Sequence, residues 1–409
     1  MKRAAVVVLS SYPADVRVRR EAESLVDAGF KVDLICYNKS DLPKQETING
    51  VNVFRLKMQR KRASKLRYFW EYISFTTRAL FKLSHLHLQN RYDLIHVHNM
   101  PDILVFSALL PRLLGAKIML DLHDPTPEVF IAKYGIHPNH PIIKILKWLE
   151  KISIRFAHQV ITPNKAFQDV FISRGCPRQK IDIVMNTPME HIFNSNSTNE
   201  NSRSKANNRK FVVMFHGTIV KRHGILTALK AMAKLRPQIP GLAFDVYGNG
   251  DFTEDFLKQV KQLNLEDIVR YHGFVTNETI AAAIPQIDLG IIPNEVNAFT
   301  RLNLPVRIFE YLSLHKPVIV PQTRGIRDYF SPDTLNFFEG DDSDNLAEAI
   351  LTIYRHPEQQ KEIINRGYKI YQQYRWESQK KHFCGIAEKL IEDDVLKTSS
   401  FSLSPEQGM

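Results

Sequence analysis

Residues 294–320 read N-E-V-N-A-F-T-R-L-N-L-P-V-R-I-F-E-Y-L-S-L-H-K-P-V-I-V. The apolar run at 287–293 predicts a strand, residues 305–314 predict a short helix, and 317–320 predict another strand. A strand, a loop that opens at a helix start, and a second strand form a βαβ unit, and free amides at such a helix start bind phosphate. Glu310 lies about a turn inside this helix, where its carboxylate can accept hydrogen bonds from both hydroxyls of a ribose. The segment therefore predicts a nucleotide site.

The part L-P-V-R-I-F-E-Y-L-S-L-H-K-P-V-I-V resembles the donor-nucleotide signature of retaining glycosyltransferases of family GT4. These enzymes have the α/β fold called GT-B, in which two Rossmann-like doubly wound domains face a central cleft. The resemblance implies that Glu310 binds the donor ribose and that three neighbours lie beside the donor: Asn303, Leu304 and Arg307. Many members carry a second Glu eight positions earlier, which contacts the transferred sugar. Leu302 occupies that position here and the nearest other acid is Glu295, so the sugar-contacting group stays open.

Length and composition describe an ordinary two-domain protein with a positive charge. The chain has 409 residues, of which 44% are hydrophobic and 24% charged. Its apolar start, residues 1–9, is too short for a membrane span and lacks a cleavage site, so we expect a strand and not a signal peptide. The three cysteines show no ligand spacing and are typical of a reducing compartment. The net charge of +12 favours an anionic partner: nucleic acid, anionic lipid or a phosphorylated substrate.

Short apolar runs alternate with helical segments along most of the chain, as in doubly wound domains. The predicted strands cover residues 4–9, 31–37, 51–56, 93–98, 117–122, 159–162, 181–185, 211–215, 243–247 and 268–272. Residues 195–210 are polar and rich in Asn and Ser, which predicts an interdomain linker. We therefore expect an acceptor-binding domain at 1–194, a donor domain at 211–375, and a disordered tail at 397–409. The resemblance implies that a final helix at about 376–393 packs back on the first domain.

Two turns of the second half have the form of a diphosphate site. His216, Gly217 and Thr218 follow its first strand, and K-R-H-G at 221–224 opens the next helix. GT4 enzymes carry an arginine and a lysine where this chain has Thr218 and His223. The resemblance therefore implies that Lys221 or Arg222 supplies the cation. Gly248, in Y-G-N-G-D, would let the backbone approach the donor closely. A solvated basic turn and a plain glycine turn are the alternative interpretations.

The segment D-L-H-D-P-T-P-E at 121–128 ends a predicted strand of the first half, so its imidazole and carboxylates should face the cleft. It resembles the GT4 segment whose histidine contacts the donor sugar. This implies that His123, with Asp124 beside it, orients the sugar near the reacting carbon. On the acceptor side we expect Asp15, Arg17 and His98, for which helix capping is the alternative. A metal site is a competing hypothesis, built from His96, His98, His123 and Asp124. The family needs no metal, so we predict no metal ligand and no cofactor other than the donor.

Residues 55–87 combine many basic residues with apolar ones at helical spacing. The basic residues are Arg55, Lys57, Arg60, Lys61, Arg62, Lys65, Arg67, Arg78 and Lys82, and Glu71 is the one acid. A basic amphipathic helix with aromatic residues favours an anionic membrane surface. Packing against the first sheet explains part of the apolar stripe equally well. Nucleic acid is not expected, because no recognition motif accompanies the charge.

The resemblance implies a metal-independent, retaining transfer of a sugar from a UDP- or GDP-sugar to a hydroxyl acceptor. We expect cell-surface polysaccharide or glycolipid synthesis, on an oligosaccharide or lipid-linked acceptor. The protein should be cytoplasmic and peripheral on the cytoplasmic face of the membrane. Two rival hypotheses remain open: a sugar-nucleotide epimerase of the same fold, and a non-catalytic basic binding protein. Leu302 and Thr218 are the departures that favour the second rival.

Overall fold

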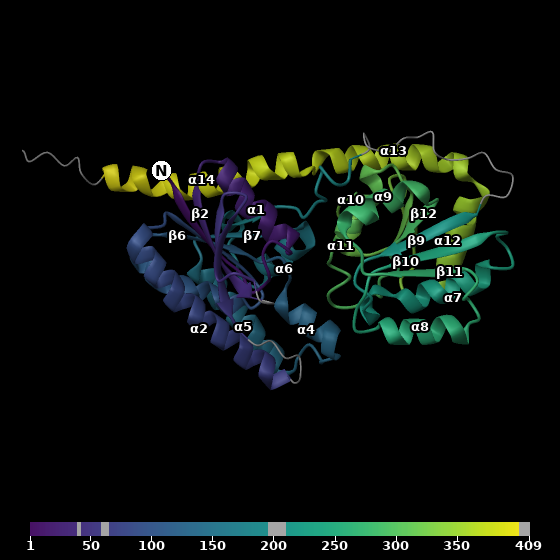
Figure 1. The fold of residues 1–409 in the computed structure, drawn as a ribbon, viewed down its shortest axis with the longest axis horizontal. Coiled ribbons are helices and arrows are strands. Elements are labelled where there is room, and N and C mark those ends of the chain that lie inside the picture. The colour runs from purple at the N-terminus through teal and green to yellow at the C-terminus, as the bar shows by residue number, and fades with distance from the viewer. Residues whose placement is uncertain (39–41, 59–64, 195–209, 401–409) are drawn as a thin grey trace, which may run out of the picture. The chain divides into compact units, whose positions relative to one another are not determined.

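A computed structural model describes residues 1–38, 42–58, 65–194 and 210–400 (Figure 1). Side chains are described in these ranges except at 65–69 and 393–400. The chain divides into two units. Unit 1 comprises Met1–Ile131, Gly135–Met185 and the chain from Gln379 onward, and unit 2 comprises Asn186–Ser378 with Ala132–Tyr134.

Unit 1 is built on an eight-stranded sheet with the order β3-β4-β2-β1-β5-β6-β7-β8. All neighbouring strands are parallel except the edge pair β3 and β4. The central strands are apolar and buried on both faces, as parallel sheets require. The strands are β1 Arg3–Val7, β2 Lys31–Asn38, β3 Gln45–Ile48, β4 Val51–Lys57, β5 Leu94–His98, β6 Lys117–Asp121, β7 Gln159–Thr162 and β8 Ile181–Ile183.

Helices cover both faces of this sheet. Helix α14 packs beside α1: Lys380 Nζ lies 2.6 Å from Asp27 Oδ2, and Phe383 is fully buried with its ring 5.4 Å from that of His96. Helices α2 and α5 both pack against the short 3-10 helix η1. The helices are α1 Val16–Asp27, α2 Lys65–Asn90, η1 Asp102–Ala108, α3 Leu109–Leu113, α4 Thr126–Tyr134, α5 Pro141–Phe156, α6 Lys165–Ser173, η2 Arg178–Lys180 and α14 Trp376–Ser400.

Unit 2 contains a fully parallel six-stranded sheet with the order β11-β10-β9-β12-β13-β14. Its strands are β9 Phe211–His216, β10 Leu242–Tyr247, β11 Val269–Gly273, β12 Leu289–Ile291, β13 Val318–Pro321 and β14 Asn336–Phe338. The helices are η5 Lys221–His223, α7 Ile225–Leu235, α8 Thr253–Gln262, α9 Asn277–Ala283, η6 Ile284–Gln286, α10 Val306–Ser313, α11 Arg324–Arg327, α12 Ser343–Arg355 and α13 Pro357–Gln373.

A close contact between β12 and α10 fixes the helix that carries Glu310. Tyr311 is fully buried and its hydroxyl donates to the Met214 carbonyl at 3.1 Å. A Cβ at Gly290, in β12, would lie 2.5 Å from the Tyr311 ring. Glycine in the middle of this strand therefore lets α10 lie close against the sheet.

Both halves have the predicted α/β architecture, and the C-terminal end differs from the sequence prediction. Helix α14 continues to Ser400, so the first residues of the predicted disordered tail are helical; 401–409 lie outside the described residues. The predicted linker also lies outside them, except for Lys210. Within the described ranges, no helix combines the length and the apolar character that a membrane crossing requires.

The contact of α14 with unit 1 predicts that Phe383→Ala destabilises this unit by about 3–5 kcal/mol, because a fully buried ring leaves a cavity. Calorimetry should show a lower-temperature transition for unit 1. The exposed Lys389→Ala, on the same helix, serves as the control. Equal transition temperatures for the two variants would show that the docked helix adds nothing to the stability of unit 1.

Candidate functional site

Three loops of unit 2 meet backbone to backbone at the carboxyl edge of its sheet. Gly217, after β9, donates its N–H to the Tyr247 carbonyl at 3.0 Å. Gly248, after β10, has φ 134°, and a Cβ there would lie 1.8 Å from the Gly217 oxygen. Gly224 has φ 67°, and its Cβ would lie 1.7 Å from the oxygen of Pro293, after β12. Only glycine permits these approaches, so the three loops share one site.

Arg307, in the first turn of α10, ties two of these loops together. Its guanidinium donates to the His216 carbonyl at 2.7 Å and to Asn294 Oδ1 at 3.1 Å, and it lies 5.2 Å from the centre of the Phe215 ring. A Cβ at Gly217 would lie 3.3 Å from its Nη1 atom. The resemblance implies that Arg307 lies beside the donor nucleotide. In the structure its guanidinium donates two hydrogen bonds to protein oxygens and so holds the loops of the site in place.

Glu310 faces the end of β9. Its Oε2 lies 3.3 Å from His216 Nε2, and the two side chains are 16% and 6% exposed. Burial raises the pKa of Glu310 to about 7, although the nearby Arg307 opposes this shift. Burial and Arg307 hold the pKa of His216 well below its usual value, so this imidazole is neutral. The site thus contains one carboxyl group whose charge changes near neutral pH.

The basic turn supplies two cations. Lys221 is exposed and Arg222 is partly exposed. His223 Nδ1 lies 2.6 Å from the Thr218 oxygen, and burial lowers the pKa of His223 to about 3, so it contributes no charge. Burial raises the pKa of Glu295 while Lys221 opposes this shift, which places these two charges near each other. Lys221 and Arg222 are therefore the cations of this turn that an anion could reach.

Residues before α10 contribute backbone more than side chains. Leu302 and Leu304 are 4% and 7% exposed, so their side chains belong to the core of unit 2. Asn303, between them, is partly exposed. No side chain caps the helix after Pro305. Of the predicted donor residues here, Leu304 can therefore offer only main-chain atoms, and the helix start stays available to an anion.

In unit 1, Asp121 at the end of β6 joins two predicted site residues. Its Oδ2 lies 2.8 Å from His98 Nδ1 and 3.4 Å from His123 Nδ1. Burial alone would raise the pKa of Asp121, but the hydrogen bonds from His123 and His98 outweigh it and hold the pKa well below its usual value. The ionised carboxylate favours protonated Nδ1 atoms on both rings. This arrangement leaves Nε2 of each imidazole as the acceptor.

Glu21, in α1, extends this cluster inward, and sequence reasoning missed it. Its Oε2 lies 3.6 Å from His96 Nε2 and 3.9 Å from His98 Nε2. Burial raises the pKa of Glu21 well above its usual value. Burial also holds the pKa of His96 well below its usual value, so the His96 imidazole is neutral near pH 7. One ligand atom from each of Glu21, His96, His98 and Asp121 lies within 4.8 Å of the others. This set could hold a dication, and it differs from the predicted competitor, which used His123 and Asp124.

The other predicted residues of unit 1 gather around this cluster. Asp15 caps α1 and pairs with Arg17, whose Nε lies 3.3 Å from Asp15 Oδ1. Burial alone would raise the pKa of Asp15, but Arg17, His123 and His98 together lower it. Burial would lower the pKa of Arg17, but Asp15 and Asp124 raise it. Unit 1 thus brings together Asp15, Arg17, His98, His123 and Asp124.

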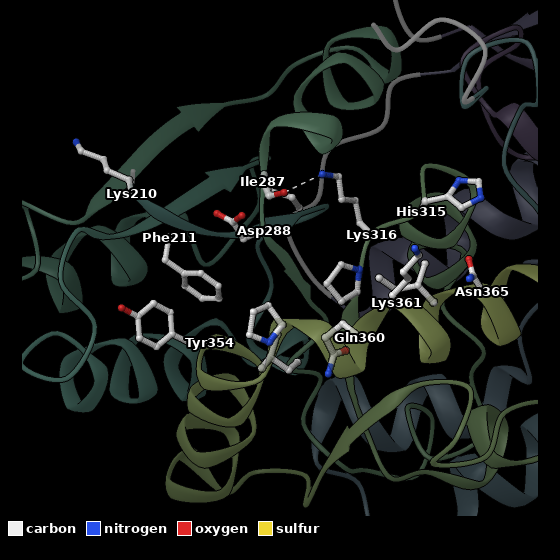
Figure 2. Close-up of a pocket in the computed structure, with 14 residues that line it drawn as sticks. Lys210, Phe211, Ile287, Asp288, His315, Lys316, Tyr354, Gln360, Lys361 and Asn365 are labelled. Atoms are coloured by element: carbon white, nitrogen blue, oxygen red, sulfur yellow. Dashed lines mark hydrogen bonds between the residues drawn. The ribbon is translucent and has the colours of Figure 1, made fainter. Parts of the chain in front are cut away.

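A cavity of about 490 Å³ lies elsewhere in unit 2 (Figure 2). It is lined by Phe211 and Asp288, at the amino ends of β9 and β12, and by Lys316, whose Nζ donates to the Ile287 carbonyl at 3.0 Å. The amino edge of a parallel sheet is opposite the edge at which ligands bind in such folds. This cavity is therefore separate from the Glu310 site.

Family models match both halves of the chain. Residues 14–187 match the glycosyl transferase 4-like domain and residues 196–370 match the glycosyl transferases group 1. An uncharacterized glycosyltransferase of Methanocaldococcus jannaschii is 24% identical over 370 residues, which cover 87% of this chain and 89% of that protein. The chitobiosyldiphosphodolichol beta-mannosyltransferase of Candida albicans is 23% identical over 78% of this chain and 72% of its own.

Solved structures show the same fold. The sucrose-phosphate synthase of Thermosynechococcus elongatus superposes with a TM-score of 0.79 at 18% identity and covers 96% of this chain and 100% of its own. Anabaena HepE in complex with UDP-glucose superposes with a TM-score of 0.70 at 14% identity, over 95% of this chain and 100% of its own. The fold is therefore GT-B, as the sequence predicts.

The pKa of Glu310 leads to a pH-dependent prediction. It is about 7 in the folded chain but near 4.3 for an ordinary unfolded Glu, so ionising the buried group lowers stability as pH rises from 4.3 to 7. Glu310→Gln removes this cost. The variant should melt at a higher temperature than the parent at pH 8 and at nearly the same temperature at pH 4, below both pKa values. The exposed Glu254→Gln is the control, and a pH-independent difference for Glu310→Gln would contradict the assignment.

Proposed function

Because the chain belongs to the GT4-like group 1 glycosyltransferases, we propose that it transfers a hexose from a UDP- or GDP-sugar to a hydroxyl acceptor with retained anomeric configuration. The observation that carries the proposal is Glu310, held beside His216 where the glycine loops after β9, β10 and β12 converge. Neighbours of the same fold solved with UDP and with UDP-glucose support a nucleotide-sugar donor.

In this proposal each donor residue has a defined task. Glu310 accepts hydrogen bonds from the ribose hydroxyls, and Gly217 and Gly248 let main-chain atoms reach the nucleotide. Lys221 and Arg222, with the start of α10, hold the diphosphate and stabilise the charge that develops as it departs. Further contacts come from Thr218, Asn303 and the Leu304 main chain, while Arg307 keeps the loops in place.

Unit 1 would supply the groups that act on the sugar and the acceptor. His123, oriented by Asp121, presents its Nε2 acceptor to a sugar hydroxyl, with Asp124 beside it. Asp15, Arg17 and His98 would bind the acceptor. The departing phosphate would take up the acceptor proton on the same face of the sugar, so no side-chain nucleophile is required. Retention predicts that the product has the anomeric configuration of the donor.

We assign the acceptor to a lipid-linked or oligosaccharide intermediate of polysaccharide or glycolipid synthesis. Relatives are named chitobiosyldiphosphodolichol beta-mannosyltransferase and amylovoran biosynthesis glycosyltransferase, which supports such an acceptor. The reaction would then take place on the cytoplasmic face of a membrane, with the enzyme bound peripherally.

A panel of UDP- and GDP-sugars, assayed for hydrolysis and transfer, tests this function, and NMR of the product tests retention. Epimerisation of a free sugar nucleotide without acceptor would favour an epimerase instead. Failure to bind both UDP and GDP in titration calorimetry would favour a non-catalytic binding protein. The buried Leu302, in the place of a catalytic-site carboxylate of many relatives, is the observation behind that alternative.

Glu310→Ala should weaken binding of the accepted nucleotide by about 1.5–3 kcal/mol, because a charge-assisted pair of ribose bonds is lost. Titration calorimetry at pH 8, where Glu310 is ionised, measures the difference. The exposed Glu254→Ala controls for a general effect of charge removal. Parent-like affinity in a folded Glu310→Ala protein would refute the ribose assignment.

Activity should not require a divalent metal. The buried set of Glu21, His96, His98 and Asp121 is the candidate ligand group found among the described residues, and none of its members is assigned to the diphosphate. Transfer should therefore continue after EDTA treatment, and elemental analysis should accompany the assay. Loss of transfer with EDTA and its recovery with Mg²⁺ or Mn²⁺ would overturn this prediction.

A further inference from the structure

Exposed large apolar side chains are concentrated on three helices of unit 1. Fourteen such side chains are exposed in the described part of the chain, and nine of them lie on α2, on α5, and on α3 with its C-cap residue. On α5 they are Ile142, Ile145 and Trp148, of which the last two are 55% and 58% exposed. This clustering marks an interaction surface, because scattered single exposures would need no explanation.

Helix α5 is more apolar than its packing requires. Its buried residues are Ile143, Glu150, Ser153 and Ile154, which lie on one side of the helix. Ile145 and Trp148, three residues apart, lie next to each other on the opposite, exposed side. The apolar surface of α5 therefore continues beyond the part that the core of unit 1 covers.

The exposed face of α5 is also positively charged. Its single acid, Glu150, is fully buried and pairs with Arg174, whose Nη1 lies 2.9 Å from Glu150 Oε2. Lys144, Lys151 and Arg155 are exposed, and Lys147 is partly exposed. The helix thus presents apolar residues beside unopposed basic ones, a pattern that suits the headgroup region of an anionic bilayer.

Helices α3 and α2, near α5, also carry exposed apolar side chains. The Arg112 guanidinium, on α3, lies 4.8 Å from the centre of the Phe156 ring, at the end of α5. Helices α2 and α5 both pack against η1. In α2, Trp70 and Phe81 are 67% and 69% exposed.

The structure changes the contribution expected from residues 55–87. Arg55 is 4% exposed, pairs with Glu46, and donates to the Pro43 and Tyr12 carbonyls. It is therefore a buried structural residue and not a lipid contact, which corrects the prediction for this position. Arg60, Lys61 and Arg62 lie outside the described residues, as do the side chains of Lys65 and Arg67. Helix α5 carries both exposed basic and exposed apolar side chains.

We propose that the exposed face of α5 binds an anionic phospholipid bilayer, with Ile145 and Trp148 inserted at the interface and Lys144, Lys147 and Lys151 on the headgroups. Trp at an interface and Lys beside it fit the headgroup boundary. This inference deepens the proposed membrane-bound acceptor. Vesicle binding is measured without donor or acceptor, so failure of the transferase assignment and failure of this surface are distinguishable.

Sedimentation of the full chain with phosphatidylglycerol-containing and pure phosphatidylcholine vesicles tests the proposal. We expect binding to the anionic vesicles that weakens with salt. The triple variant Lys144→Ser, Lys147→Ser, Lys151→Ser should bind about a hundredfold more weakly. Ile145→Ser with Trp148→Ser should reduce binding about tenfold or more. Trp148 fluorescence, isolated by Trp70→Phe and Trp376→Phe, should shift to shorter wavelength on binding.

Matched changes on unit 2 are the controls. Leu257→Ser with Phe274→Ser removes two exposed apolar residues. The triple variant Lys230→Ser, Lys261→Ser, Lys369→Ser removes three exposed positive charges, as many as the triple variant on α5. Both controls should bind like the parent. Three results would each overturn the proposal. The α5 variants could bind vesicles like the parent, or binding could be lost only in Trp70→Ser with Phe81→Ser, which would assign the surface to α2. An α5 variant that only converts a dimer to a monomer in sedimentation analysis would show that this face joins two copies of the chain.

Discussion

The guanidinium of Arg307 holds together the loops at the carboxyl edge of the unit 2 sheet. It joins the end of β9, through the His216 carbonyl, to the loop after β12, through Asn294. Gly217 leaves the space that this contact needs. With these segments fixed, α10 brings Glu310 against His216, and the exposed Lys221 and the partly exposed Arg222 remain for an anion. A partly buried cation thus organises the scaffold, while separate and more accessible cations are available to an anion.

In unit 1, burial shifts the pKa values of a cluster of polar side chains. Asp121 stays ionised since two imidazoles donate to it, whereas burial raises the pKa of Glu21 and lowers that of His96 and so disfavours the charged form of both groups. The cluster thus holds one hydrogen-bonded carboxylate, and burial opposes further charge beside it. The hydrogen bond between His123 Nδ1 and Asp121 fixes the orientation of the His123 ring. A residue proposed to position a sugar requires such a fixed orientation.

The sequence predicted the two α/β halves and the helix that carries Glu310, because apolar strands and a turn–helix signature are local signals. It missed β3, whose residues Gln45–Ile48 are polar and pair at an antiparallel edge. It also missed Glu21, since an acid within a helix looks like a surface residue until the fold places β5 beneath it. Arg55 was misjudged for the same reason: its partners come from distant segments, which charge and spacing along the chain cannot reveal.

The docking of α14 has a consequence for biosynthesis. Unit 1 contains residues from both ends of the chain, and its core includes Phe383 against His96. The ribosome makes residues 1–185 first, yet Phe383 emerges only after all of unit 2 has been synthesised. The first half must therefore keep an uncovered patch over β5 and α1 until Phe383 has left the ribosome. A chain that stops early would leave a nascent first half without its last helix, which is a ready substrate for chaperones and proteases.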